Sequence, residues 1–175
     1  RTGKSTLRNI IENKLDIPEL ISHTTRDIGK GEVDGKTYYF VNDEEMKEVD
    51  KLEEAKYAEK HYALSKKEVF DKFENNKKAF VIMERKGIEM LKERVKTLPF
   101  KVKIKVVYIY STLEEIKERL YERNRNGTKA VEKRIKNIKE KSELNNFDIA
   151  DKVVLNKNEG LDEAFKDLKN YILFS

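Results

Sequence analysis

The amino-acid sequence predicts an α/β fold of three layers, in which a central parallel sheet is covered by helices on both faces. The main observation is that short apolar runs alternate along the chain with longer segments whose apolar residues recur at helical spacing. The length of 175 residues fits one domain with a single sizeable core. No internal repeat or low-complexity linker divides the sequence, so we expect a single domain.

The first predicted helix runs from about Gly3 to Lys14. Leu7 and Ile11 belong to a series of apolar residues at helical spacing along this segment. We expect the helix to end before Pro18, because proline disfavours helical geometry in the residue that precedes it.

Between this helix and the middle of the chain, the sequence predicts a loop, a strand and two short helices. Three glycines fall close together and mark the loop: Gly29, Gly31 and Gly35. Residues 37–41 are aromatic and β-branched, so we expect a strand there. Asn42 and Asp43 are both suitable caps for one helix, and Ser65 with Glu68 forms the capping-box pattern of the other.

The second half of the chain contains the best candidates for buried strands. Residues 79–83 and 104–110 are apolar runs, and each is followed by a segment with helical periodicity. A further strand is expected at 152–155 and a closing helix through residues 161–172. Strands that alternate with helices in this way are typical of a parallel sheet.

Residues 3–6 read Gly-Lys-Ser-Thr at the start of a helix, which is the second half of a P-loop. Backbone N–H groups at a helix N-terminus attract phosphate oxygens. Lys4 adds a positive charge for the β- and γ-phosphates, and the Ser5 hydroxyl is a ligand for Mg²⁺. A plain helix start does not explain Lys4, because the helix dipole favours acidic residues there. The sequence does not contain the strand and first glycine of such a loop, which we expect to precede Arg1.

Composition excludes several kinds of site and partner. The chain has no cysteine, which excludes disulfides, thiolate zinc sites and thiol nucleophiles. It has no run of about 20 apolar residues, the length that a membrane helix needs. The 38 basic residues are interleaved with 33 acidic ones, as on solvated helix faces. We therefore expect neither nucleic acid nor a membrane as a partner.

Beyond the phosphate loop, the sequence resembles the guanylate kinase family. Residues 22–26 read Ser-His-Thr-Thr-Arg, residues 31–35 read Gly-Glu-Val-Asp-Gly, and residues 38–40 read Tyr-Tyr-Phe. They match the family's S-x-T-T-R, G-E-x-x-G and Y-x-F blocks, in order and in register, and the resemblance extends over nearly the whole chain. It implies a cytoplasmic enzyme that transfers the γ-phosphoryl group of ATP to GMP with Mg²⁺, giving ADP and GDP.

The resemblance also implies how the chain is organised. The core would comprise residues from about 1–25, 76–118 and 145–175, the GMP-binding segment about 26–75, and a helical lid about 119–144. The oligomeric state stays open between monomer and dimer.

On the acceptor side, the resemblance implies that Ser22 and Glu53 recognise guanine and that Glu84 also binds the substrate. A glutamate accepts hydrogen bonds from guanine N1–H and the exocyclic amine, a donor pair that adenine does not present. Arg26 would bind the GMP phosphate as a bidentate fork, beside the hydroxyl groups of Tyr38 and Tyr62.

On the donor side, the resemblance implies a set of residues that bind ATP: Gly3, Lys4, Ser5, Thr6, Arg119 and Asn156. It implies that Lys4, Arg26, Arg123 and Arg134 are catalytic, with Lys4 and the arginines of the lid neutralising charge on the transferring group. Ser5 would be the metal ligand.

Three positions depart from the family pattern. Gly29 stands where the family has a second phosphate-binding arginine, and the adjacent Lys30 offers charge without the planar fork. Leu64 stands where the family has a small hydroxyl residue. Ile82 stands where it has the first of two aspartates, the second being replaced by Glu84.

These departures leave other functions open. A guanylate-kinase-like domain that has lost phosphoryl transfer would bind phosphorylated peptides or proteins, and a different P-loop kinase would act on another small phosphorylated substrate. A nucleic-acid binder is suggested only by the nine basic residues between positions 119 and 141. Glu53 separates the kinases, because a substrate without a purine has no need of it.

Overall fold

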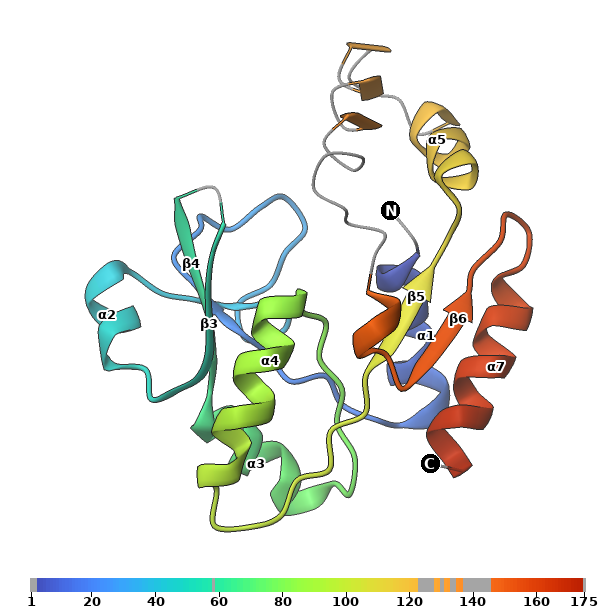
Figure 1. Ribbon diagram of the computed structural model, residues 1–175. Coiled ribbons are helices and arrows are strands. Elements are labelled where there is room, and N and C mark those ends of the chain that lie inside the picture. Colours follow the sequence, from blue (N-terminus) through green and yellow to red (C-terminus); the bar gives the residue numbers. More distant parts are fainter. Residues whose placement is uncertain are drawn as a thin grey trace. The chain divides into compact units, whose positions relative to one another are not determined.

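The computed structural model describes residues 3–57, 59–122, 128–129, 131–132, 135–136 and 146–174 (Figure 1). The chain divides into two compact units, each described by itself. The terminal unit contains residues 1–15 and 105–175, and the central unit contains residues 16–104.

The central unit is built on a four-stranded sheet of strand order β2-β1-β4-β3. Its strands are β1 (His23–Thr24), β2 (Tyr39–Phe40), β3 (Lys51–Tyr57) and β4 (Lys60–Ser65). β1 pairs in parallel with β2 and antiparallel with β4, while β3 and β4 form an antiparallel hairpin. The middle of this sheet therefore sets His23 between Tyr39 and Ala63.

Helices complete the core of the central unit. They are α2 (Asp43–Glu48), α3 (Lys66–Asn75) and α4 (Arg85–Arg94), the last followed by a 3₁₀ turn (Val95–Thr97). α4 lies alongside β3, as Figure 1 shows. Leu52 of β3 and Leu64 of β4 are fully buried and pack in one apolar cluster with Leu91 of α4. This packing fixes the hairpin against the helix.

The two predicted helix caps of the central unit are present, but one of them differs in detail. Asn42 and Glu45 form a complete capping box at α2, with both hydrogen bonds at 2.8 Å. At α3 the Ser65 hydroxyl accepts the Glu68 N–H at 3.1 Å, but the Glu68 carboxylate accepts the N–H of Ile21 at 2.9 Å instead of returning to the cap. The buried Glu68 carboxylate therefore links the start of α3 to the segment that contains Ile21.

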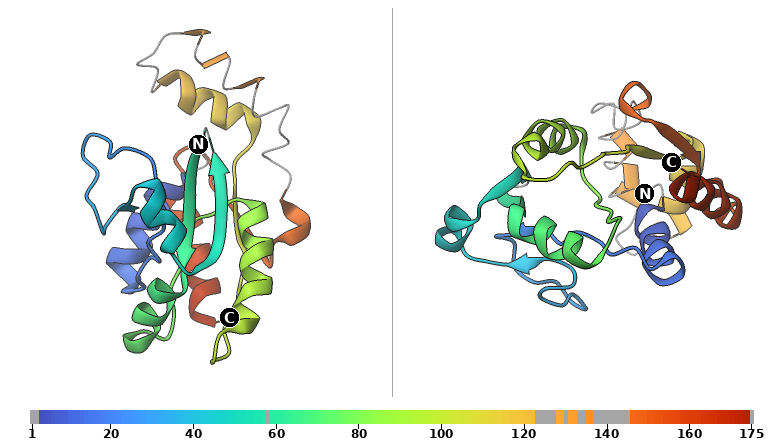
Figure 2. Two further views of the ribbon diagram at one scale, coloured as in Figure 1. Left: turned by 90° about the vertical axis from the view of Figure 1, so that its left-hand side faces the viewer. Right: turned by 90° about the horizontal axis from the view of Figure 1, so that it is seen from below.

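The terminal unit contains a parallel pair of strands with helices beside it. Its elements are α1 (Lys4–Leu15), β5 (Val107–Tyr110), α5 (Leu113–Glu122), a 3₁₀ turn (Phe147–Ile149), β6 (Lys152–Leu155) and α7 (Leu161–Phe174). β5 pairs with β6 in parallel, with Val107 opposite Lys152. α7 packs against both α1 and β6, and Figure 2 shows these helices beside the strand pair.

The α/β class is confirmed, as are the helix at the phosphate loop, the strand at 152–155 and the closing helix. The strand expected at 79–83 is wrong: only Phe80 pairs, in an isolated parallel bridge with Glu19, and Ile82 is 40% exposed. The strand expected at 37–41 shortens to two residues, because residues up to Tyr38 still belong to a turn closed by the Gly35 N–H, which donates to the Tyr38 carbonyl.

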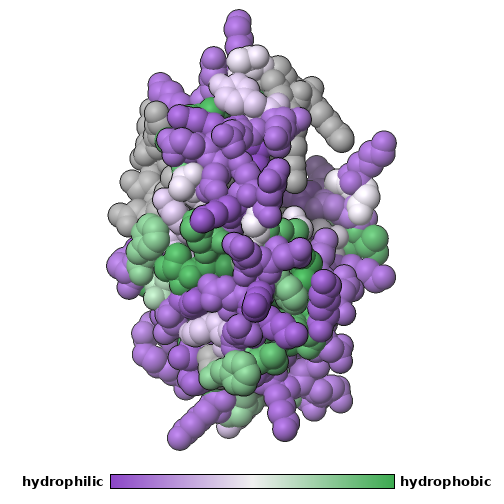
Figure 3. Space-filling view, turned by 90° about the vertical axis from the view of Figure 1, so that its right-hand side faces the viewer, coloured by the Kyte–Doolittle hydropathy of each residue, from purple (hydrophilic) through white to green (hydrophobic). Residues whose placement is uncertain are grey.

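The surface is strongly polar. Hydrophilic side chains predominate on the face shown in Figure 3, with hydrophobic ones in smaller patches between them. Among the described residues, no helix is both long and apolar enough to cross a membrane.

Candidate functional site

A pair of threonines fixes the segment that carries Arg26. Thr24 is fully buried, and its hydroxyl donates to the carbonyl of His61 in β4 at 3.1 Å. The Arg26 N–H donates to that same hydroxyl at 3.2 Å. The Thr25 hydroxyl accepts the His61 N–H at 3.0 Å. Arg26 therefore leaves the end of β1 from a backbone that is anchored to the neighbouring strand.

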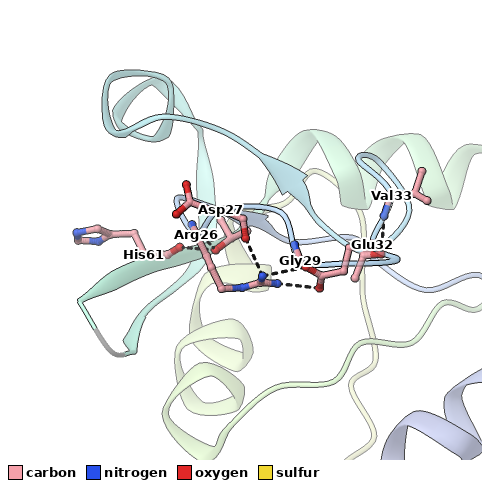
Figure 4. Close-up of polar contacts among 8 residues, drawn as sticks. Arg26, Asp27, Gly29, Glu32, Val33 and His61 are labelled. Carbon is pink, nitrogen blue, oxygen red and sulfur yellow. Dashed lines mark hydrogen bonds and ion pairs between the residues drawn. The ribbon is translucent and has the colours of Figure 1, made fainter.

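The Arg26 guanidinium is bound by a carboxylate of the glycine-rich loop (Figure 4). Nη1 and Nη2 donate to the two carboxylate oxygens of Glu32, both at 2.8 Å, and Nη1 also donates to the Asp27 carbonyl at 2.8 Å. The hydrogen bond to Glu32 raises the pKa of Arg26. The same bond, with a second from the Gly29 N–H, lowers the pKa of Glu32.

Aromatic rings surround this guanidinium. Its Cζ lies 5.5 Å from the ring centroid of Tyr38 and 5.6 Å from that of Phe40, within the range of cation–π attraction. The rings of Tyr38 and Tyr62 meet edge to face at 5.7 Å, and a hydrogen bond to Tyr62 also raises the pKa of Arg26. Burial raises the pKa of Tyr38, so its phenol stays protonated as a donor. The three residues predicted to bind the acceptor phosphate therefore lie together.

Glu53 is a buried carboxylate on β3. A register shift between Lys51 and Glu53 interrupts the pairing with β4, and the side chain of Glu53 is only 5% exposed. A Cβ atom on Gly87, in the first turn of α4, would lie 2.7 Å from Glu53 Oε1, so a side chain at position 87 would require the Glu53 carboxylate to move. Burial raises the pKa of Glu53, and the nearby charges of Glu54 and Glu84 raise it further.

The remaining predicted acceptor residues have different surroundings. Ser22 is half-buried next to β1, and its carbonyl accepts the Tyr39 N–H at 3.0 Å. Glu84 is exposed at the N-cap of α4, where its charge acts on Glu53. Leu64 is a core residue with no exposed surface, and the adjacent Ser65 hydroxyl caps α3.

Sequence reasoning missed two carboxylates that organise this part of the central unit. The Gly-Glu-Val-Asp-Gly motif by itself gives Glu32 no role, yet Glu32 holds Arg26. Glu68 was interpreted as a cap, yet it accepts the Tyr39 hydroxyl at 2.9 Å, which together with burial raises the pKa of Tyr39 to about 12. Only the spacing of Glu32 from Arg26, within one short loop, could have indicated the first contact.

In the terminal unit, Gly3 shows why the phosphate motif needs glycine. Its φ of +85° lies in the left-handed region, and its carbonyl accepts the N–H groups of Thr6 and Leu7, both at 3.1 Å. A Cβ atom at this position would lie 2.1 Å from Asn156 Nδ2. Gly3 and Asn156, both predicted to bind ATP, are therefore adjacent. Lys4 and Ser5 begin α1, but their side chains lie outside the described part of the chain.

Arg119 is held close to the same place. Its Nη2 donates to the Asn156 carbonyl at 2.6 Å, its Nη1 to the Ser111 hydroxyl at 3.0 Å, and its Nε to Asn158 Oδ1 at 2.6 Å. Ser111 is fully buried and itself donates to the Asn156 carbonyl at 2.7 Å. The sequence signal for Ser111 was its position directly after a predicted strand, where it was not singled out.

Two predicted catalytic residues, Arg123 and Arg134, lie outside the described residues. Among the residues that are described, no group of three or more His, Asp or Glu side chains could hold a metal ion.

Comparisons with known proteins match this chain to one family over nearly its whole length. The family model described as guanylate kinase matches residues 1–174. The guanylate kinase of Oceanobacillus iheyensis is 32% identical over 160 residues, which cover 88% of this chain and 74% of the relative. That of Caldanaerobacter subterraneus is 29% identical over 176 residues, covering 98% and 81%. The crystal structure of guanylate kinase from Anaplasma phagocytophilum matches with a TM-score of 0.68 at 22% identity, covering 96% of this chain and 79% of that one.

Proposed function

Because this chain belongs to the guanylate kinase family and is an ATP:GMP phosphotransferase, we propose that the two clusters described above bind its two nucleotides. The central unit binds GMP, and the terminal unit binds ATP. The observation that supports this most is the grouping of Arg26 with Tyr38 and Tyr62, which supplies a cation and two phenol groups in one place.

For the acceptor, the chemistry of each side chain matches one part of GMP. Arg26 offers the N–H pairs that bind a phosphate in two parallel hydrogen bonds. Tyr38 and Tyr62 add neutral donors. Glu53 accepts hydrogen bonds from guanine, and adenine would leave this buried carboxylate unpaired, which is costly. Ser22 and Glu84 complete the proposed acceptor site.

For the donor, the start of α1 supplies backbone N–H groups for the phosphates of ATP, with the charge of Lys4 beside them. Arg119 and Asn156 lie next to this helix start through Gly3. We propose that Arg123 and Arg134 neutralise charge on the transferring group. Mg²⁺ commonly binds through one or two protein groups and the substrate phosphates. The Ser5 hydroxyl at the start of α1 fits this need, and the ion would supply further charge neutralisation.

The reaction asks for position and charge rather than covalent help. The acceptor oxygen of GMP is already ionised, so no strong general base is needed. The protein must hold donor and acceptor phosphates in line and offset the charge that shifts between oxygens. A cytoplasmic location, where both nucleotides are present, is part of this proposal.

The first test is an assay of ADP release with Mg·ATP and, in turn, GMP, dGMP, AMP and UMP. We expect turnover that depends on guanine. We also expect Lys4→Ala to lower kcat by about 10³-fold or more, because transfer depends on preorganised charge at the phosphates. Lys14→Ala is the matched control, since it removes the same charge from the other end of the same helix. Normal turnover in a folded Lys4→Ala variant would contradict the P-loop assignment.

A further inference from the structure

We propose that Glu32 is a positioning residue, which holds one edge of the Arg26 guanidinium so that a second edge meets the phosphate of the acceptor nucleotide. This inference rests on the proposed function, because it assigns a role within the GMP site. It also gives a reason for glycine at position 29.

The contacts divide the guanidinium into an edge that Glu32 binds and a second edge that faces Tyr62. Glu32 takes one N–H of Nη1 and one of Nη2, and the Asp27 carbonyl takes the other N–H of Nη1 (Figure 4). The Nε–H and the second Nη2–H lie on an adjacent edge and take no part in these three bonds. Two parallel N–H groups on one edge are what a phosphate binds. Tyr62 is also bonded to the guanidinium, so a phenol lies within reach of the same ligand.

Glu32 can act as a support because it is itself held. Its Oε2 accepts the Gly29 N–H at 2.6 Å in addition to the bond from Arg26. A Cβ atom at position 29 would lie 2.7 Å from this oxygen, so a side chain there would require the end of the Glu32 side chain to shift. The φ of Gly29 is not in the left-handed region, so its lack of a side chain, rather than its backbone, is what this arrangement uses.

Glu32 lowers the loss of side-chain conformational entropy that Arg26 undergoes when phosphate binds. An unsupported arginine loses much rotamer freedom when a ligand orders it, whereas a supported one has lost it before binding. The opposing effect is repulsion between the Glu32 carboxylate and the phosphate. Glu32 is partly exposed, with 23% of its side chain accessible, so water screens this repulsion, whereas the hydrogen bonds from Arg26 are direct. We therefore expect support to outweigh repulsion.

The test compares GMP with guanosine, which has the same base and no phosphate. Glu32→Gln keeps the shape of the side chain but loses the charge and one acceptor. We expect it to raise KM for GMP about tenfold, while kcat, KM for ATP and the inhibition constant of guanosine change less than about twofold. Gly29→Ala should give the same shift, and the two changes together should not add, because both act through one contact. Glu32→Asp, which keeps the charge, should recover most of the affinity.

A matched control is Glu89→Gln, which breaks an exposed Arg–Glu pair in the same unit at a 3.0 Å contact with Arg85. It should leave KM for GMP unchanged, and none of these variants should lower the melting temperature by more than about 2 °C, since exposed pairs stabilise little.

Three outcomes would overturn the inference. A lower KM for GMP in Glu32→Gln would mean that the carboxylate competes with phosphate. An unchanged KM would mean that it has no role, and equal weakening of GMP and guanosine would mean that the whole loop has changed. Calorimetric titration separates the role of Glu32 from the proposed function. Absent turnover in the wild type would contradict the enzyme assignment. The ratio of the affinities for GMP and guanosine would still test the role of Glu32.

Discussion

The two ends of the proposed GMP site treat charge in opposite ways. At the phosphate end, Arg26 is 31% exposed in its side chain and already has a carboxylate partner in Glu32. At the guanine end, Glu53 is 5% exposed, and its pKa is raised by burial and by the like charges of Glu54 and Glu84, which outweigh the charge of Arg94 and a backbone hydrogen bond from Leu64. Arg26 is therefore paired with a carboxylate before the substrate binds, whereas burial disfavours the charged form of Glu53.

This difference indicates where affinity and where selectivity arise. A cation that is exposed and already paired gains little from a second anion, so it is suited to a phosphate that every nucleotide carries. A buried carboxylate with a raised pKa is costly to keep charged until guanine supplies two donors, so it rejects ligands that supply none. We expect the guanine end to dominate discrimination between nucleotides.

The largest effect should therefore come from Glu53→Gln. We expect kcat/KM for GMP to fall by about 100-fold or more, because the amide presents an N–H group where guanine requires an acceptor. The unliganded variant should nevertheless be more stable near neutral pH. Burial raises the pKa of Glu53, so the folded state binds more protons than the unfolded state between the ordinary and the raised pKa, and stability falls as pH rises through this window.

The measurements are steady-state kinetics with GMP and thermal unfolding without ligand. Glu54→Gln is the control, because it removes the neighbouring exposed carboxylate of the same strand. If Glu53→Gln kept wild-type selectivity for GMP over AMP, the guanine end would not be where base recognition occurs.

A smaller effect is expected from Gly87→Ala. Alanine in a helix is favoured over glycine by about 1 kcal/mol, so α4 alone would gain stability. The new Cβ atom would meet Glu53 at 2.7 Å from Oε1 and 3.3 Å from Cγ, so the carboxylate must move. We expect KM for GMP to rise about tenfold with KM for ATP unchanged, and with little loss of thermal stability. An unchanged KM for GMP would show that the position of Glu53 is less constrained than its burial indicates.

The sequence predicted the parts of this site that depend on local pattern. Periodicity located α1 and α7, and the blocks around Arg26 and Tyr38 indicated residues that the structure brings together. Glycine before the lysine of the phosphate motif was also predictable, and the positive φ of Gly3 accounts for it.

The sequence could not predict what depends on tertiary pairing. The β3–β4 hairpin was missed because residues 51–57 are largely charged, and only pairing with β4 and packing of Leu52 make a strand of them. Residues 79–83 are apolar enough for a strand, yet only Phe80 pairs, through hydrogen bonds with the Pro18 and Leu20 backbones. The Glu68 carboxylate formed its bonds to Ile21 and Tyr39 instead of the local cap, because those partners come from segments that are distant in sequence.

The smallest effect is expected in the pH dependence of kcat/KM for GMP, which should distinguish the guanine end from the phosphate end. Because the pKa of Glu53 is raised by burial, its carboxylate begins to protonate at a higher pH than an ordinary glutamate, and the acceptor for guanine is lost. We expect kcat/KM for GMP to fall as pH is lowered from about 7.5 to about 5.5 by more than the titration of the GMP phosphate alone, whose second pKa is about 6, would give. The Glu53→Gln variant reports that phosphate contribution by itself, since its amide does not titrate, and Arg26 stays charged throughout because its pKa is raised. If the pH profiles of the wild type and the Glu53→Gln variant were parallel, the titrating group would lie on GMP and not on Glu53. The proposed electrostatic difference between the phosphate end and the guanine end would then be wrong.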